Sequence, residues 1–322
     1  MFFFIHPSVH LRTRSFDFFI SLFPKGEVRM FHDESWKLDP DFATVQQVVF
    51  FQTLPDLKDR GLLRPKRVLV MPMYDAVLSV RDDQWWEYRS FRFVSFCGAL
   101  TAKLSSLGLD VFSLQFFPSL GPDVVIPPHG LIKVFFWQRA RVPDLQQVLE
   151  QFVPGTALEV FFRSDVGASN LAVPSHVKLR PLPWFSTRED YLTEVASCDL
   201  YVAPRIAEGI GMSFLEAMAC GVPVLAWDGP TMNEYIIHDR NGLLFGKETR
   251  WVSKNVLNRQ REQLRDDRKQ WRNTYEAAIP GLLKYIFSDA PVRLRSRHPF
   301  YAALGWVKSS VRWAVGFPGK KK

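Results

Sequence analysis

The stretch "DLYVAPRIAEGIGMSFLEAMACGVPVLAW", residues 199–227, decides the fold. Its apolar start predicts a buried β-strand that ends near Pro204, and a helix is expected from about Met212 to Cys220. Gly221 follows directly, as expected of the glycine that ends many helices, and Pro223 opens a second apolar strand. The order strand, turn, helix, strand indicates an α/β fold with parallel strands.

The turn in this stretch carries acids and glycines in a pattern that suggests a ligand. Glu208 lies in the turn with Gly209 and Gly211, and Glu216 lies on the following helix. Ligands of open α/β sheets bind where strands end and helices begin, and a helix N-terminus attracts phosphate. Ionised carboxylates only accept hydrogen bonds, so these acids would bind hydroxyl groups instead. A nucleotide sugar, with a diphosphate between two polyhydroxylated groups, fits this layout; alternatively, both acids are solvent-facing helix-start residues stabilised by the helix dipole.

Apolar strands alternate with helical segments twice along the chain. The expected strands are residues 2–5, 27–31, 45–51, 67–72, 91–96 and 110–117, then 132–137, 158–163, 176–180, 199–204, 222–227 and 242–245. Helices are expected at 143–152 and 188–197, with Ser186 or Thr187 as the cap of the second. Such alternation predicts two parallel sheets, each covered on both faces, and hence two Rossmann-like domains facing a cleft.

A proline-rich segment, residues 117–130, reads as the linker between the two arrays. We therefore predict an N-terminal domain at 1–128 and a second domain at 129–247. Residues 248–322 are predicted as a C-terminal helical segment with a basic aromatic tail, in which Pro280 breaks or kinks the helix.

The net charge of +8 is unevenly distributed. Residues 247–322 hold 18 Lys and Arg against 6 Asp and Glu, a balance of +12, so the remainder of the chain has −4. This asymmetry indicates a polyanionic partner, either an anionic membrane or a nucleic acid. The tail 298–322 resembles an interfacial helix, with an apolar stripe, flanking tryptophans and a terminal lysine run. Alternatively, it packs across the domains as a structural helix.

Targeting signals are not evident in the sequence. The apolar run at residues 2–5 is too short for a signal peptide, and no window approaches the 18 apolar residues of a spanning helix. Three separated cysteines, Cys97, Cys198 and Cys220, support neither a disulfide framework nor a zinc site. These features predict a cytoplasmic protein that is peripheral on the inner face of the membrane.

Residues 208–216, "EGIGMSFLE", and 217–245, "AMACGVPVLAWDGPTMNEYIIHDRNGLLF", resemble the donor-site signature of retaining glycosyltransferases of family 4, which have the GT-B fold. The resemblance is strong over 199–245, fair back to Lys133, and only architectural over the N-terminal half. It implies transfer of a sugar from a nucleotide-diphosphate sugar to an acceptor hydroxyl, with retention and without a metal or cofactor. By the resemblance, Glu208 contacts the donor sugar and is catalytic, Glu216 takes the ribose hydroxyls, and the diphosphate is bound by the backbone at Gly209, Ile210, Gly211, Met212 and Ser213.

The diphosphate-neutralising residues of the family are only partly present. The family usually carries a Gly-Arg followed a few residues later by a Lys; here Gln138 stands for the glycine, Arg139 matches the arginine, and the lysine is absent. Arg141 or Arg205 could substitute, because a leaving diphosphate needs charge neutralisation. Alternatively, Arg139 and Arg141 are ordinary surface cations.

The acceptor side has weaker signals. Tyr74 and Asp75 follow the strand at 67–72, and Asp75 is a candidate catalytic residue that would orient or deprotonate an acceptor hydroxyl. A turn-forming Asp is the alternative. His6 also follows a strand and could act similarly, unless it is a packed or solvated histidine.

Together these features predict a glycosyltransferase whose acceptor is a lipid-linked or cell-envelope glycan, held by the N-terminal domain. A non-catalytic GT-B-like protein that binds nucleotide sugars is one alternative. A nucleic-acid-binding protein is another, which the lack of a recognised module disfavours. The sugar, the base and the acceptor are not legible in the sequence.

Overall fold

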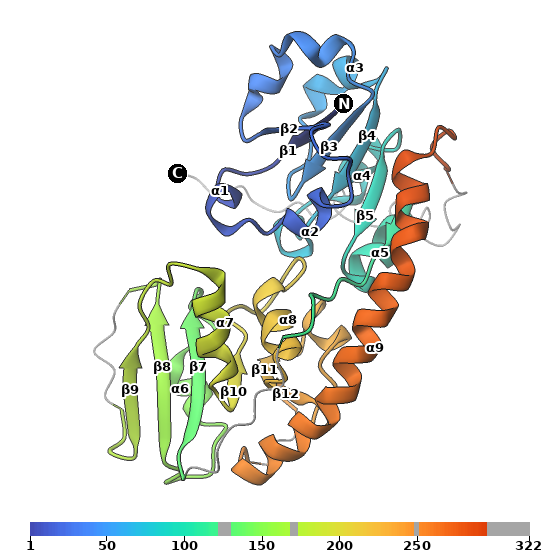
Figure 1. Cartoon of the computed structure of the whole chain (residues 1–322). Helices are drawn as coiled ribbons and strands as arrows, with labels where there is room; N and C mark the ends of the chain where they lie inside the picture. Colours follow the sequence, from blue (N-terminus) through green and yellow to red (C-terminus); the bar gives the residue numbers. More distant parts are fainter. Residues whose placement is uncertain (122–129, 168–172, 248–250, 295–322) are drawn as a thin grey trace, which may run out of the picture. The chain divides into compact units, whose positions relative to one another are not determined.

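The computed structural model describes residues 1–121, 130–167, 173–247 and 251–294 (Figure 1). The chain forms two compact units, which we call the first unit, Met1–Ser113 with the chain from Gly281 on, and the second unit, Leu114–Pro280. Each unit contains one six-stranded parallel sheet. The predicted pair of Rossmann-like α/β domains is therefore confirmed.

The sheet of the first unit has the order β2-β1-β3-β4-β5-β6. Its strands are β1 (Phe2–Ile5), β2 (Val28–Phe31), β3 (Gln47–Phe51), β4 (Arg67–Met71), β5 (Arg92–Ser95) and β6 (Asp110–Ser113). Every residue of β1, β3 and β5 is buried, as expected for apolar strands covered on both faces. The helices are α1 (His10–Thr13), α2 (Asp17–Ile20), α3 (Arg60–Leu63), α4 (Asp82–Glu87) and α5 (Gly98–Ser106), with 3-10 turns at Glu34–Lys37, Pro40–Ala43, Leu57–Asp59 and Tyr74–Ala76.

The sheet of the second unit has the order β12-β11-β10-β7-β8-β9. Its strands are β7 (Ile132–Gln138), β8 (Leu158–Ser164), β9 (Val177–Pro181), β10 (Leu200–Val202), β11 (Val224–Trp227) and β12 (Gly242–Phe245). Its helices are α6 (Leu145–Leu149), α7 (Arg188–Ala196), α8 (Met212–Ala219) and the 3-10 turn Met232–Glu234. The chain runs outward from β7 to β9 and then returns to β10 on the other side of β7. The strand order thus reverses between β7 and β10, which is where open α/β sheets bind their ligands.

The local signals that predict helix ends are mostly confirmed. Thr187 caps α7 by accepting a hydrogen bond from the Asp190 N–H, and Gly221, after α8, is left-handed with φ 77°. Of the two effects expected of Pro280, the break is wrong: α9 (Lys254–Phe287) continues through Pro280. Residues 122–129 of the predicted linker and the predicted interfacial helix at 298–322 lie outside the described residues.

Two buried acids attach α9 to the second unit. Asp199, fully buried before β10, accepts hydrogen bonds from the Lys133 N–H at 2.9 Å and from Lys254 Nζ at 2.6 Å. Asp267 of α9 accepts one from the Asn241 amide at 2.8 Å and two from Arg240.

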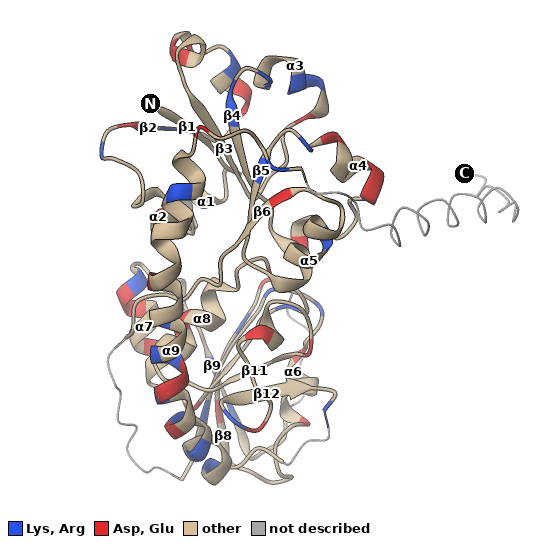
Figure 2. Ribbon diagram, turned by 90° about the vertical axis from the view of Figure 1, so that its right-hand side faces the viewer, with Lys and Arg blue, Asp and Glu red and all other residues tan. Residues whose placement is uncertain are grey.

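Charges of both signs are interspersed along α9 (Figure 2). In the part of the chain that the structure describes, every helix is too short or too polar to span a bilayer.

Arg92 fixes the C-terminal end of α9 within the first unit. Its guanidinium donates to the carbonyls of Tyr285 at 3.0 Å, Ser288 at 2.7 Å and Ala290, although the residue is only 8% exposed. Tyr285 in turn donates its hydroxyl to the Asp110 carbonyl at 2.8 Å. A single buried side chain therefore satisfies three carbonyls at and just beyond the helix end.

Arg92→Ala is expected to lower the free energy of unfolding by about 2–4 kcal/mol, because buried carbonyls lose a charged donor. Urea unfolding followed by circular dichroism measures the change. Arg81→Ala is the control: Arg81 is exposed and pairs with the exposed Asp83, so the loss of this pair should cost little. Equal stabilities of the two variants would contradict the role of Arg92.

Candidate active site

The predicted donor residues lie at the carboxyl edge of the second sheet, on both sides of its switch point. Arg139 directly follows β7, and Arg205 and Glu208 follow β10, the neighbouring strand. The same turn leads into α8, so its amide groups and both acids belong to one edge of the sheet. The topology therefore brings together residues that are far apart in the sequence.

The start of α8 requires glycine at position 211. Gly211 is left-handed, with φ 78° and ψ 36°, and a Cβ atom there would lie 1.9 Å from Cε1 of the buried Phe214 ring. Both the backbone conformation and the close approach exclude a side chain. The first turn of α8 begins at Met212, and its unpaired amides lie beyond the end of β10. No side chain at position 211 covers them.

Thr231, which was not predicted from the sequence, holds the turn that carries Glu208. Its hydroxyl donates to the Glu208 carbonyl at 2.7 Å, and Thr231 is fully buried in the loop after β11. Thr231 has φ 74° and ψ −56°, a costly conformation for a β-branched residue. No local pattern in the sequence signals this contact, because it joins loops that follow two different strands.

Glu216 is buried and paired with an arginine. The residue is 9% exposed, and Arg188, at the start of α7, donates to its Oε1 from Nε at 3.0 Å and from Nη2 at 2.7 Å. Burial raises the pKa of Glu216, whereas the charge and hydrogen bonds of Arg188 lower it. Glu208 is half-buried. The interpretation of both acids as solvent-facing helix-start residues is therefore wrong for Glu216.

Two tyrosines, the half-buried Tyr191 and the buried Tyr201, lie beside this ion pair. The Tyr191 hydroxyl is 3.5 Å from that of Tyr201, which also hydrogen-bonds Ser213 in the first turn of α8. Burial raises the pKa of Tyr201 to about 12 and that of Tyr191 well above its usual value. Both phenols are therefore neutral at physiological pH, and Arg188 is the positive charge that contacts the Glu216 carboxylate.

The arginines after β7 lie on the surface. Arg139 and Arg141 are exposed, and the Arg139 guanidinium lies 5.5 Å from the centre of the Trp137 ring. Arg205 is half-buried. Their surroundings fit either surface cations or anion ligands, so their contact with a diphosphate stays a prediction.

In the first unit, Asp75 and Tyr74 occupy a half-buried 3-10 turn after β4. His6 is 2% exposed, and its ring packs 4.7 Å from that of Phe16, so the packed alternative holds for this histidine. His10, which was not predicted as a site residue, is also buried and hydrogen-bonds Gln52.

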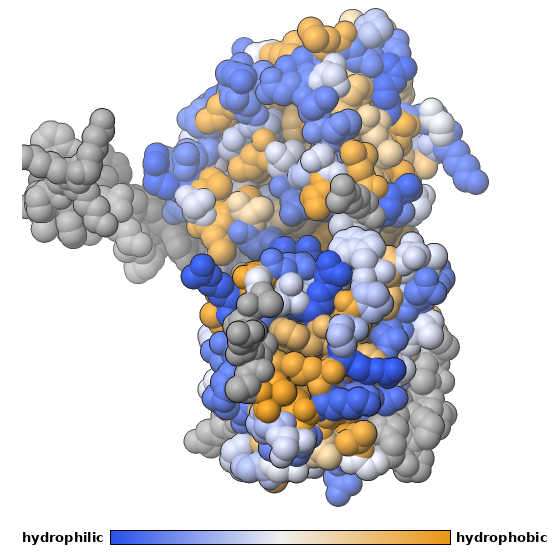
Figure 3. Space-filling model, turned by 90° about the vertical axis from the view of Figure 1, so that its left-hand side faces the viewer, coloured by the Kyte–Doolittle hydropathy of each residue, from blue (hydrophilic) through white to orange (hydrophobic). Residues whose placement is uncertain are grey.

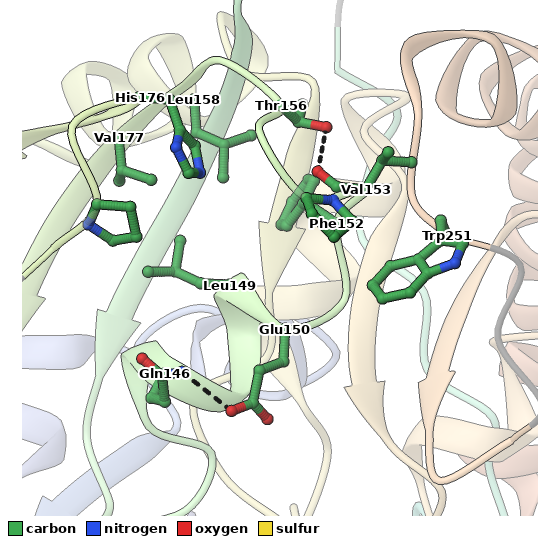
Figure 4. A pocket seen from close by; sticks show the side chains of 12 residues that line it. Gln146, Leu149, Glu150, Phe152, Val153, Thr156, Leu158, His176, Val177 and Trp251 are labelled. Carbon is green, nitrogen blue, oxygen red and sulfur yellow. Dashed lines mark hydrogen bonds between the residues drawn. The ribbon is translucent and has the colours of Figure 1, made fainter.

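A pocket of about 340 Å³ lies elsewhere in the second unit (Figure 4). Its lining includes Leu158 and Val177, the first residues of β8 and β9, together with Leu149, Phe152 and Trp251. It is therefore at the amino edge of the sheet, opposite the carboxyl edge where α/β sheets bind ligands, and we do not place the donor there. Figure 3, viewed from the β9 side, shows apolar residues gathered on this face of the second unit.

Comparison with known proteins agrees with the fold and with the family resemblance of the sequence. Residues 171–278 match the family described as glycosyl transferases group 1. Among solved structures, the GtfA/B complex has a TM-score of 0.53 and 15% identity, covering 76% of this chain and 58% of that chain. TarM of S. aureus has a TM-score of 0.51 and 14% identity, covering 75% and 55%. This chain thus spans a little over half the length of these two proteins. No curated protein matches the sequence.

The two sheets and their likeness to these structures define a GT-B protein. Within it, residues 171–278, which include β10, α8 and both acids, match the family described as glycosyl transferases group 1. The resemblance seen in the sequence is therefore confirmed.

Gly211→Ala is expected to lower the free energy of unfolding by about 3 kcal/mol or more, since left-handed strain adds to the clash with Phe214. Gly155→Ala is the matched control. Gly155 has nearly the same φ, 81°, but a Cβ atom there would meet nothing within 4 Å. Its cost should be only the conformational term of about 1–2 kcal/mol. Equal losses in chemical denaturation would show that the close approach at Gly211 is not limiting.

Proposed function

We propose that the protein is a retaining glycosyltransferase that moves a sugar from a nucleotide-diphosphate sugar to an acceptor hydroxyl. The observation that carries this proposal is the turn at the carboxyl end of β10. There α8, which has Gly211 as its N-cap, begins at the switch point of the sheet, with Glu208 before the helix and Glu216 within it. The turn lies within the region matched by the glycosyl transferases group 1 family.

In this proposal, the donor diphosphate binds the amides from Gly209 to Ser213, where the helix N-terminus favours negative charge. Glu208 positions the sugar and Glu216 binds the ribose hydroxyls. Arg139 supplies positive charge, with Arg141 and Arg205 as substitutes for the family's lysine.

The reaction would proceed without a metal by attack on the same face of the sugar that the leaving group departs from. The leaving phosphate would help to take the proton of the acceptor hydroxyl. Preorganised donors at the start of α8 would stabilise the charge that develops on the diphosphate.

The acceptor half is proposed from weaker observations. Residues 1–128 would hold the acceptor, with Asp75 orienting its hydroxyl, and residues 129–247 would hold the donor. The basic excess of residues 247–322 favours an anionic membrane surface, and hence a lipid-linked or cell-envelope glycan. The protein would then act in the cytoplasm at the inner face of the membrane.

A non-catalytic protein that binds nucleotide sugars is the second candidate. The absent lysine after Arg139 favours it, because a binding protein does not need to stabilise a leaving diphosphate. The two candidates share the donor site and differ only in turnover.

A thermal-shift screen against UDP, GDP, ADP, CMP and dTDP sugars tests the donor site. One donor class should raise the melting temperature, since a ligand at 100 times its dissociation constant adds about 2.7 kcal/mol of stability. If no donor shifts the melting temperature, the proposal fails.

The donor so identified then tests catalysis. Wild type should release the nucleotide by slow hydrolysis or transfer, and Glu208→Ala should abolish the release. Glu262→Ala, which removes an exposed acid on α9, should leave it unchanged. Binding without turnover in wild type would instead support the non-catalytic candidate.

A further inference from the structure

The geometry of the Glu216 carboxylate is asymmetric. Arg188 places both of its contacts, at 3.0 and 2.7 Å, on Oε1, and Oε2 receives neither. The Glu216 side chain is 11% exposed, whereas that of Arg188 is 58% exposed. One oxygen is therefore held by the arginine, and a small part of the Glu216 side chain remains exposed.

Arg188 comes from a different element than the acid that it holds. It is the first residue of α7, whose N-terminus is fixed by the hydrogen bond of Thr187 to the Asp190 N–H at 3.0 Å. Glu216 lies on α8, in the second turn after Gly211. The pair thus ties the α8 carboxylate to a capped helix start.

Stability alone explains this pair poorly. Removing a carboxylate from water is costly, and replacing a buried ion pair by apolar residues is often neutral or stabilising. A partly exposed arginine also loses side-chain entropy when it is held in one geometry. The ion pair is explained if the Glu216 carboxylate has to be oriented so that it accepts hydrogen bonds from hydroxyl groups of a ligand.

We propose that Arg188 is a positioning residue that holds Glu216 through Oε1 and leaves Oε2 to accept hydrogen bonds from the ribose of the donor nucleotide. This inference rests on the proposed function, because it assumes that a nucleotide binds at α8. Arg188 need not touch the nucleotide: it sets the direction and the charge of the group that does. The site would thereby discriminate ribose from sugars that lack the 2′ and 3′ hydroxyls.

Binding measurements with nucleotide analogues test this role. Isothermal titration of wild type with UDP, GDP and ADP, and with the 2′,3′-dideoxy form of each, identifies the nucleotide and its ribose preference. Wild type should bind the ribo form at least tenfold more tightly. Arg188→Ala should lose about tenfold for the ribo form and little for the dideoxy form, since one charged hydrogen bond corresponds to at least that factor.

Arg180 offers a matched control. It is 56% exposed and lies 3.9 Å from Glu159, which is 9% exposed, so this pair has nearly the same burial as Arg188 with Glu216. Glu159 also contacts Lys178 at 3.2 Å and stands on β8, in the same unit. Arg180→Ala should leave the affinity for both nucleotide forms unchanged.

Two further variants separate positioning from folding. Arg188→Lys keeps a charge and one donor, so it should retain most of the ribose preference even if Arg188→Ala is unstable. In a Glu216→Gln background, Arg188→Ala should cause little additional loss, because Arg188 acts through the carboxylate.

The outcomes are distinguishable. Equal losses for ribo and dideoxy forms, or additive losses in the double variant, would overturn the positioning role. Tighter ribo binding by Arg188→Ala would also overturn it, since the arginine would then compete with the ribose. If wild type binds nucleotides without ribose preference, the inference fails while the donor site stands. If wild type binds none of them and no donor sugar shifts the melting temperature, the proposed function fails as well.

Discussion

The close approach of Gly211 to the Phe214 ring is the constraint on which the start of α8 depends. Because glycine has no Cβ atom, residue 211 can adopt a left-handed conformation beside the Phe214 ring, and α8 can begin at Met212, directly beyond the sheet. The first amides of α8 then lie at the carboxyl edge, and Glu208 precedes them. A side chain at position 211 would force either the Phe214 ring or this turn to shift.

The turn before this helix is held from outside its own strand-helix unit. Thr231 reaches the Glu208 carbonyl from the loop after β11 and keeps a strained backbone conformation while doing so. Arg188 reaches Glu216 from α7. The Glu208 backbone and the Glu216 carboxylate are therefore held by two segments that follow β11 and β9, and the two tyrosines beside Glu216 are neutral. Strain and buried charge concentrate at the same edge, as is common at binding sites.

Much of the fold could be predicted from the sequence because it rests on local signals. The apolar runs matched the strands that the structure describes, and Thr187 and Gly221 marked helix ends through their own side chain or backbone. The expected break at Pro280 is wrong, because tertiary packing can keep a long helix continuous through a proline. The predicted strand at 110–117 stops at Ser113, where the first unit ends and Leu114 enters the second.

The proposed donor motif could be predicted from the sequence because its residues are contiguous. The residues that hold it, Arg188 and Thr231, could not be predicted. Arg188 lies 28 residues before Glu216, and Thr231 lies 23 residues after Glu208, so neither spacing forms a pattern. His10 and Gln52 meet across 42 residues in the same way. Such contacts depend on which loops the sheet order brings together, and a single sequence does not display that order.

Hydrogen–deuterium exchange with the nucleotide sugar that stabilises the protein tests the central claim most directly. If the diphosphate binds the start of α8, the amides from Gly209 to Ser213 should exchange markedly more slowly when the donor is bound, because their hydrogen bonds to phosphate replace those to water. The amides lining the pocket at the amino ends of β8 and β9 should be unaffected. Protection at that pocket, with none at the start of α8, would contradict the account.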